Sequence, residues 1–225
     1  MKSKNLFMIA VLMMFGFSAM SQTEGISFGL RGGVNFQNIN GKQFDGDKLE
    51  LNMVTRFNAG VVIEIPVAPE FYFQSGLLYT TKGAKAPEGY LAPVTTVEYK
   101  LSYLELPLNL LYKPLLGTGH LLLGFGPYIA YGLGGKAKFE TPIGSTKEDI
   151  VFDNEFTRND QYGQYFKRLD FGGNLFFGYE LSNGISLQLN TQLGMAKINA
   201  DNTTYPEEKT SFKNTGFGLS LGYMF

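Results

Sequence analysis

Large apolar side chains alternate with small or polar ones along most of the chain. In the last segment they recur at Phe217, Leu219, Leu221 and Tyr223, with glycine or serine between them. A period of two is that of a β-strand, because successive side chains point to opposite faces of a sheet. The same alternation recurs in seven other segments and predicts eight strands in all: 26–37, 53–65, 71–81, 97–112, 121–134, 169–181, 185–197 and 214–225.

The connections between these segments alternate in length. Short connections follow the second, fourth and sixth strands: 67–70, 113–119 and 182–184. Long polar connections follow the first, third, fifth and seventh strands: 38–52, 83–96, 136–163 and 200–209. An even number of antiparallel strands with short turns at one end and long loops at the other is typical of a transmembrane barrel. We therefore predict an all-β fold, an eight-stranded antiparallel up-and-down transmembrane β-barrel, with both termini periplasmic and the long loops pointing outward.

The two faces of each predicted strand differ in a way that indicates which face meets lipid. One face is bulky, apolar and rich in aromatics, whereas the other alternates glycine with amide and charged residues. The interior of an eight-stranded barrel is only just wide enough for side chains, so small residues fit inside. The bulky face is then expected to meet hydrocarbon, where only a closed sheet leaves no unpaired backbone group.

The N-terminus has the composition of a targeting segment. Lys2 and Lys4 precede an apolar run at 6–17, and small residues follow before a predicted cleavage ahead of Gln22. A basic start, a short apolar core and a small-residue exit are typical of a secretory signal peptide. The run is also shorter than the roughly 20 residues that span a bilayer. We predict a cleaved signal peptide at 1–21 and one outer-membrane β-barrel domain at 22–225.

Composition excludes several classes of partner and cofactor. The 225-residue chain has 19 basic and 20 acidic residues and a net charge of -1, which gives no electrostatic reason to expect nucleic acid binding. It has no cysteine and one histidine, so thiolate and histidine-rich metal sites are not expected. We expect no cofactor and no metal.

Six stretches in order along the mature chain carry a family resemblance: "GISFGLRGGVNF" at 25–36, "FQSGLLYTTKG" at 73–83, "YLELPLNLLYK" at 103–113, "GFGPYIAYGLGG" at 124–135, "DFGGNLFFGYEL" at 170–181 and the closing "FGLSLGYMF". The chain resembles the PorT-like outer-membrane β-barrel proteins common in Bacteroidetes, and the Tyr-Leu-Glu-Leu-Pro segment is the most specific match. The resemblance implies the cell outer membrane and an eight-stranded barrel, but no single activity. It also implies that the barrel-insertion machinery reads the terminal aromatic residue.

Charged residues occupy the face that we expect to point into the barrel. They are two cations and four anions: Arg31, Arg56, Glu64, Glu105, Asp170 and Glu180. An isolated buried charge is costly, so these groups are expected to pair as a structural salt-bridge cluster in the lumen. We expect Arg31 or Arg56 to bind Glu105 or Asp170, because the guanidinium fork suits a carboxylate. A paired-carboxylate active site or an ion path is the alternative, although the strand phases show no two carboxylates converging.

Pro107 lies in the middle of the fourth predicted strand. Proline cannot donate a ladder hydrogen bond, so within sheets it is confined to edges and bulges. Because a closed barrel has no edge, we predict a local β-bulge at this position.

The preferred functional hypothesis is a non-enzymatic outer-membrane barrel with a filled lumen and a structural, interaction or narrow-transport role. Its expected partners are outer-membrane lipid, the insertion machinery and an external ligand or protein at the long loops, such as 83–96 and 136–163. One alternative is a membrane-embedded lipid-modifying enzyme, for which Ser102 and His120 are the faint candidates. Another is a soluble exported barrel that binds a small apolar ligand. The sequence specifies no ligand, oligomeric state or conductance.

Overall fold

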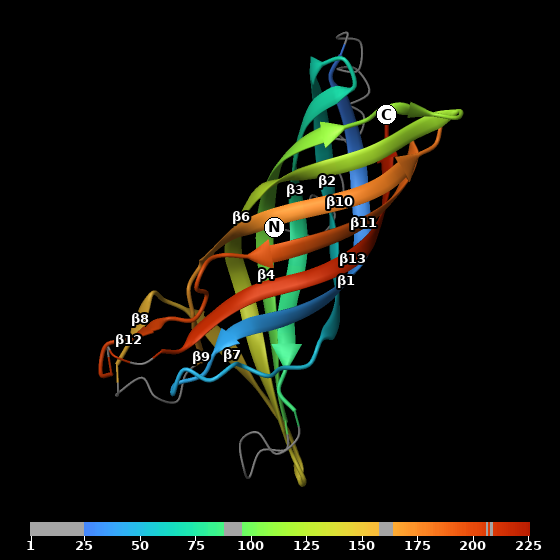
Figure 1. Ribbon diagram of the computed structural model, residues 1–225. Helices are drawn as coiled ribbons and strands as arrows, with labels where there is room; N and C mark the ends of the chain where they lie inside the picture. The colour runs from blue at the N-terminus through green and yellow to red at the C-terminus, as the bar shows by residue number, and fades with distance from the viewer. Residues whose placement is uncertain (1–24, 88–95, 158–163, 206, 208) are drawn as a thin grey trace, which may run out of the picture.

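Eight long antiparallel strands close into a ring in the computed structural model, which describes residues 25–87, 96–157, 164–205, 207 and 209–225 (Figure 1). Each strand pairs with the next, β6 pairs with β10, and β13 returns to β1. The eight are β1 (Ser27–Lys42), β2 (Val54–Ala68), β3 (Phe71–Lys85), β4 (Thr96–Tyr112), β6 (Gly119–Thr141), β10 (Leu169–Glu180), β11 (Ile185–Gly194) and β13 (Ser211–Met224). The predicted fold is confirmed, whereas the predicted signal peptide at 1–21 and the loop segments 88–95 and 158–163 lie outside the described residues.

The short connections gather at one end of the barrel. They join β2 to β3, β4 to β6 and β10 to β11, and the second contains β5 (Leu115–Leu116), which pairs with the start of β6. Gly184 closes the third at a φ of 83°, and a Cβ there would lie 2.3 Å from the Met224 carbonyl oxygen. A tight turn with positive φ against a neighbouring strand therefore requires glycine here. The chain ends beside these turns, where the Phe225 N–H donates to the Phe28 carbonyl at 2.8 Å.

The opposite end is longer and more regular than the sequence suggests. Within the predicted loop 136–163, β6 continues to Thr141 and forms a hairpin with β7 (Gly144–Phe152). Two short parallel pairs complete this end, β9 (Gln164–Phe166) with β7, and β8 (Glu155–Phe156) with β12 (Asp201–Asn202). The loop prediction was wrong for the hairpin because its strands extend beyond the part of the barrel whose outer surface is apolar. Their outward positions are polar, and polar strands have the composition of a loop.

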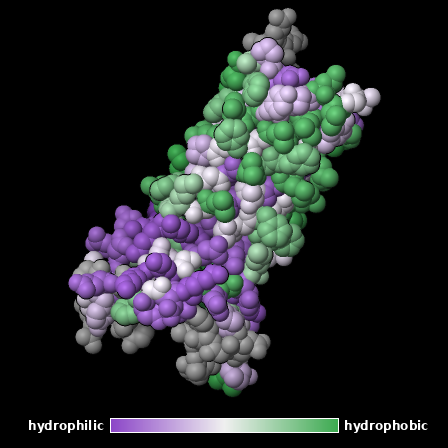
Figure 2. Space-filling view, viewed as in Figure 1, coloured by the Kyte–Doolittle hydropathy of each residue, from purple (hydrophilic) through white to green (hydrophobic). Residues whose placement is uncertain are grey.

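The bulky face of the strands points outward, as predicted. In β13, Leu219, Leu221 and Tyr223 are 45%, 62% and 44% exposed, whereas the intervening Ser220 is buried. Figure 2 shows the result as an apolar surface over the short-turn half of the barrel and a hydrophilic surface at the long-loop end. In the described parts of the chain, no helix is long and apolar enough to cross a membrane.

The one register shift between β4 and β6 does not lie at Pro107. It falls between Ser102, opposite Gly134, and Tyr103, opposite Gly132, so that Leu133 is the extra residue. The register is constant across Pro107, which is opposite Tyr128, and the Ser75 hydroxyl donates to the Pro107 carbonyl at 2.9 Å. The predicted bulge at Pro107 is therefore wrong. The strand keeps its register although Pro107 has no backbone N–H to donate, and the Ser75 hydroxyl satisfies the Pro107 carbonyl.

Candidate functional site

The lumen holds a buried cluster centred on Lys82 of β3. Its ammonium nitrogen lies 3.0 Å from Glu105 Oε2 and 3.1 Å from Asp170 Oδ2, on β4 and β10. Amide side chains complete the carboxylates: Asn214 Nδ2 donates to Asp170 at 2.9 Å, and Gln192 Nε2 donates to Glu105 at 2.6 Å. Charged groups that have left water need such partners. This set, the Lys82 cluster, ties β3, β4, β10, β11 and β13 together across the barrel.

A second cluster with the same plan lies nearer the short turns. Lys113, directly after β4, places its ammonium 3.0 Å from Glu64 Oε2 and 2.9 Å from Glu180 Oε1. Gln74 Nε2 donates to Glu64 at 3.0 Å. This Lys113 cluster therefore links β2, β3 and β10 to the end of β4.

Arg31 of β1 lies between the two clusters. Its guanidinium donates to the Gln74 and Gln188 amide oxygens at 3.4 and 3.3 Å, and it interacts electrostatically with Glu105 and Glu64, one carboxylate from each cluster. Because each lysine faces two carboxylates, each cluster keeps one uncompensated negative charge when all groups are ionised. The single positive charge of Arg31 offsets part of this excess of two negative charges without a direct salt bridge.

The structure corrects the expected partners of the arginines. Arg31 bonds amides, and Arg56 Nη2 binds Glu98 at 2.8 Å and the Tyr99 carbonyl at 2.9 Å, so neither binds Glu105 or Asp170. Carboxylates that the strand phases did not bring together do converge, since Glu105 meets Asp170 and Glu64 meets Glu180, each pair across a lysine.

The two lysines that organise the lumen escaped the sequence analysis. Lys82 lies one period beyond Thr80, in the same inward phase as Gln74 and Thr80, so extending the predicted strand 71–81 by one residue would have found it. Lys113 follows the last residue of β4 and has the appearance of a turn residue. A lysine suits these positions because its compact ammonium can meet carboxylates on two separate strands at once.

Apolar side chains close the lumen on either side of the polar network. At the long-loop end the plug comprises Ile39, Leu49, Ala84, Leu101, Tyr103, Tyr128, Ala130, Ala137, Ile150, Phe166 and Ile198. Toward the short turns, Leu111, Leu122 and Phe176 pack together with Tyr72. Phe176 is the inward exception in an otherwise alternating segment, and it contributes bulk to this smaller plug.

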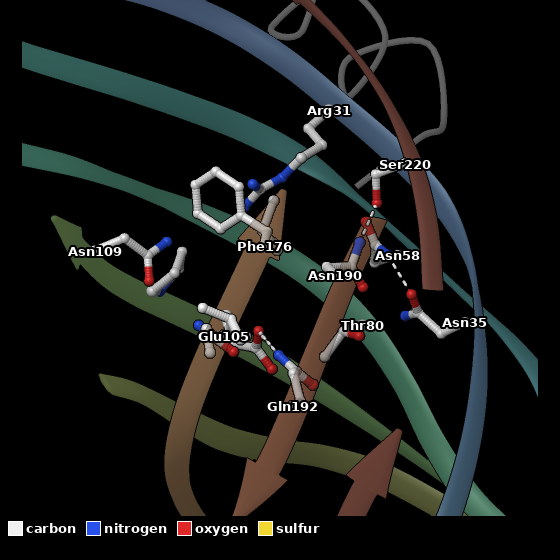
Figure 3. A pocket seen from close by; sticks show the side chains of 14 residues that line it. Arg31, Asn35, Asn58, Thr80, Glu105, Asn109, Phe176, Asn190, Gln192 and Ser220 are labelled. Carbon is white, nitrogen blue, oxygen red and sulfur yellow. Dashed lines mark hydrogen bonds between the residues drawn. The ribbon is translucent and has the colours of Figure 1, made fainter. Parts of the chain in front are cut away.

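Two small cavities lie among the described side chains of the lumen. One cavity of about 40 Å³ is lined mainly by amides and by Arg31, Glu105 and Phe176 (Figure 3). Figure 3 also shows the hydrogen bonds from Asn58 to Asn35 and from Asn190 to Ser220, both 2.8 Å. A second cavity, of about 10 Å³, lies beside Arg31 and Glu64. Such volumes suit a few water molecules, whereas organic ligands occupy roughly 300 Å³ or more.

The candidate residues for an enzyme are far apart. Ser102 pairs with Gly134 near the long-loop end, whereas His120 pairs with Leu115 and Glu180 beside the short turns. A nucleophile and its base must lie within hydrogen-bond reach, so these two cannot form such a pair. Among the described residues, no group of three or more His, Cys, Asp or Glu side chains could hold a metal ion.

The long-loop end carries its own ion pairs in water. Asp201 of β12 accepts from the Lys167 ammonium at 2.6 Å and from the Lys197 ammonium at 2.8 Å. These hydrogen bonds, that of Lys167 foremost, hold the pKa of the Asp201 carboxyl below its usual value. Phe156 and Tyr165 stack nearby with ring centroids 5.6 Å apart. The loops thus present an ordered polar surface beyond the barrel.

The chain matches one family model and is similar to several solved structures. A family model described as "Outer membrane protein beta-barrel domain" matches residues 20–200. Similar solved structures include OprG from Pseudomonas aeruginosa (16% identity, TM-score 0.47, covering 89% of this chain and 96% of that one). Neisserial surface protein A (12%, 0.45, 90% and 100%) and the Yersinia pestis attachment invasion locus protein Ail (11%, 0.40, 90% and 100%) are also similar. No curated protein matches the sequence.

Proposed function

Because this chain belongs to the outer membrane protein beta-barrel domain family, we propose that it is a closed, non-enzymatic barrel of the outer membrane that presents its long-loop end to external partners. The observation that carries the proposal is the filled lumen. Two lysine clusters, two apolar plugs and cavities of about 40 and 10 Å³ support an anchor and interaction platform over a channel. In finer detail the proposal places the chain among the PorT-like proteins of Bacteroidetes, with a cleaved signal peptide and periplasmic termini.

The outward apolar face favours this proposal over a soluble barrel. A soluble carrier of apolar ligands would need an apolar interior and a polar exterior. In this barrel many charged and amide side chains are buried, and large apolar side chains are exposed on the outside. The distance between Ser102 and His120 likewise favours a non-enzymatic role over a lipid-modifying enzyme.

Conductance in planar bilayers tests the closed lumen. We expect the purified monomer to give little single-channel current, because side chains fill the eight-stranded interior. A large and stable conductance would contradict the proposal. Heat-modifiable gel mobility of the same sample provides the control that the barrel is folded.

Cysteine labelling in whole cells tests the orientation. The chain has no native cysteine, and Ile143, at the tip of the β6–β7 hairpin, is 99% exposed. We expect Ile143→Cys to react with a membrane-impermeant maleimide in intact cells, whereas the matched Asn183→Cys, in a short turn, should react only after lysis. The reverse pattern would place the long loops in the periplasm.

A further inference from the structure

A groove opens in the outer wall of the barrel where the β4–β6 register shifts. It has a volume of about 370 Å³ and is lined by Lys100, Ser102, Gly134, Gly135, Lys136, Asp149 and Ile150. A Cβ added at Gly134 would meet no atom within 4 Å, so this glycine leaves open space in the groove. The bulge therefore creates a hollow in a surface that is otherwise a regular sheet.

Two lysines face each other across this groove. Lys100 and Lys136 are directly opposite on β4 and β6, and both are exposed on the outer face. Like charges at directly opposed positions repel and destabilise a sheet. Asp149 lies 3.6 Å from Lys136, but both side chains are largely in water, and Lys100 has no carboxylate partner in the part of the chain that the structure describes. The pair thus keeps an excess of positive charge that an anion could neutralise.

The groove lies at the edge of the apolar surface that faces the long-loop end. Leu104 and Leu133, the next outward residues along β4 and β6 toward the short turns, are exposed apolar side chains. On the neighbouring β6–β10 face, the exposed guanidinium of Arg168 covers the Tyr131 ring at 5.5 Å. Basic side chains directly beyond an apolar belt are placed at the depth of lipid headgroups.

A polar group in the groove adds a hydrogen-bond donor. The Ser102 hydroxyl accepts from the Tyr79 hydroxyl at 2.9 Å, which leaves the Ser102 hydrogen available to an acceptor. Two lysines and this serine line the groove, and phosphate oxygens are strong acceptors that suit ammonium and hydroxyl donors alike.

We propose that this groove binds the phosphate-bearing headgroup of a membrane lipid, whose acyl chains lie along Leu104 and Leu133. The inference rests on the proposed membrane location. The phosphate takes the place between Lys100 and Lys136, and Asp149 holds Lys136 from the solvent side. The groove, at about 370 Å³, has room for a headgroup, in contrast to the cavities of the lumen.

Lipid titration of the purified full-length protein tests the proposal, with native mass spectrometry counting bound lipid. The probes are phosphatidic acid and diacylglycerol with the same acyl chains, which differ only in the phosphate, and inorganic phosphate as a competitor. We expect saturable binding of phosphatidic acid, much weaker binding of diacylglycerol, and no competition by millimolar inorganic phosphate. Equal binding of the two lipids, or displacement by free phosphate, would overturn the assignment of a lipid headgroup.

Variants locate the site. Lys100→Gln/Lys136→Gln should weaken phosphatidic acid binding roughly tenfold or more, since each basic residue near the surface contributes to attraction. Gly134→Leu keeps both lysines but fills the groove, and it should also weaken binding. The control is Lys42→Gln/Lys48→Gln, because these lysines are also opposite each other but do not line this groove, and the net charge changes equally. Retained affinity in the first variant, or an equal loss in the control, would sink the proposal.

The same samples separate this inference from the proposed function. Each variant is assayed for heat-modifiable mobility and for fractionation with the outer membrane. A folded, membrane-located barrel without phosphate-dependent binding refutes only the lipid site. A wild-type chain that fractionates without detergent as a soluble protein refutes the membrane role itself.

Discussion

The two lysine clusters of the lumen have the same composition but different surroundings. In each, one ammonium lies within about 3.1 Å of two carboxylates. The Lys82 side chain is 0% exposed and its nitrogen lies 4.1 Å from the centre of the Tyr128 ring, beneath the larger apolar plug. The Lys113 side chain is 10% exposed and lies beside the short turns. The two clusters therefore have the same arrangement of charges at two different depths from water.

We infer from the comparison that depth from water, more than the number of ion pairs, determines how much each cluster contributes to the free energy of unfolding. Removing one partner of a fully buried group strands the others, because water cannot reach them. Near an opening, water or a neighbouring polar group can replace the lost partner at lower cost. The Lys82 cluster is thus a point where the fold depends on complete charge pairing.

The largest expected effect follows loss of the deeper lysine. Lys82→Met should destabilise the barrel by roughly 3–5 kcal/mol, because Glu105 and Asp170 would be left buried without their cation. Equilibrium urea unfolding in lipid vesicles, followed by heat-modifiable mobility, measures the change. The compensated variant Lys82→Met/Glu105→Gln/Asp170→Asn should recover much of the loss, since it removes all three charges. No recovery would show that shape, and not charge, sets the cost.

Loss of the shallower lysine is expected to destabilise the barrel less than loss of Lys82. Lys113→Met should cost about 1–2 kcal/mol in the same assay, because the Lys113 and Glu180 side chains are each 10% exposed, although that of Glu64, at 3%, is as buried as that of Glu105. The matched variant is Lys113→Met/Glu64→Gln/Glu180→Gln. A loss equal to that of Lys82→Met would mean that depth does not distinguish the clusters.

The difference between the outer face and the lumen explains how much of the structure the sequence could predict. The ring of strands was predictable because lipid imposes one chemistry on the outward positions of the apolar surface, so the alternation survives from β1 to β13. The contacts inside the lumen were not predictable, because the stagger between strands decides which inward residues meet. The period of two assigns a residue to a face but does not report this stagger. Lys82 bonds Asp170, 88 positions away, across the barrel.

The shift at Leu133 was hidden for a different reason. It falls in the run Gly132 to Gly135, where small residues on both faces leave no alternation to reveal a change of phase. Inward positions of β6 are even before the shift, as at Ala130, and odd after it, as at Ala137. The groove between Lys100 and Lys136 exists because of this change of phase, so the sequence alone could not place Lys136 opposite Lys100 on the outer face.

The smallest expected effect comes from a third arrangement that inverts the other two. At the long-loop end one carboxylate, Asp201, lies between two lysines, Lys167 and Lys197, and half of its side chain is exposed. Hydrogen bonds from these lysines lower the pKa of Asp201. A carboxyl whose folded pKa is depressed contributes stability above its unfolded pKa, near 4, and loses it as the pH falls through the folded value.

We therefore expect the pairing of β12 with β8 to loosen as the pH is lowered below about 4, by less than roughly 1 kcal/mol because the ion pairs are in water. Amide hydrogen exchange at Asp201–Asn202 as a function of pH measures this, and Asp201→Asn should remove the dependence. Exchange at the short-turn end of the β1–β13 ladder, where Leu30 is opposite Tyr223, serves as the internal control, since it lies at the other end of the barrel from this carboxyl. If Asp201→Asn exchanged with the same pH dependence as the wild type, the local loosening would have to arise from other carboxyls, and depth would no longer rank all three arrangements.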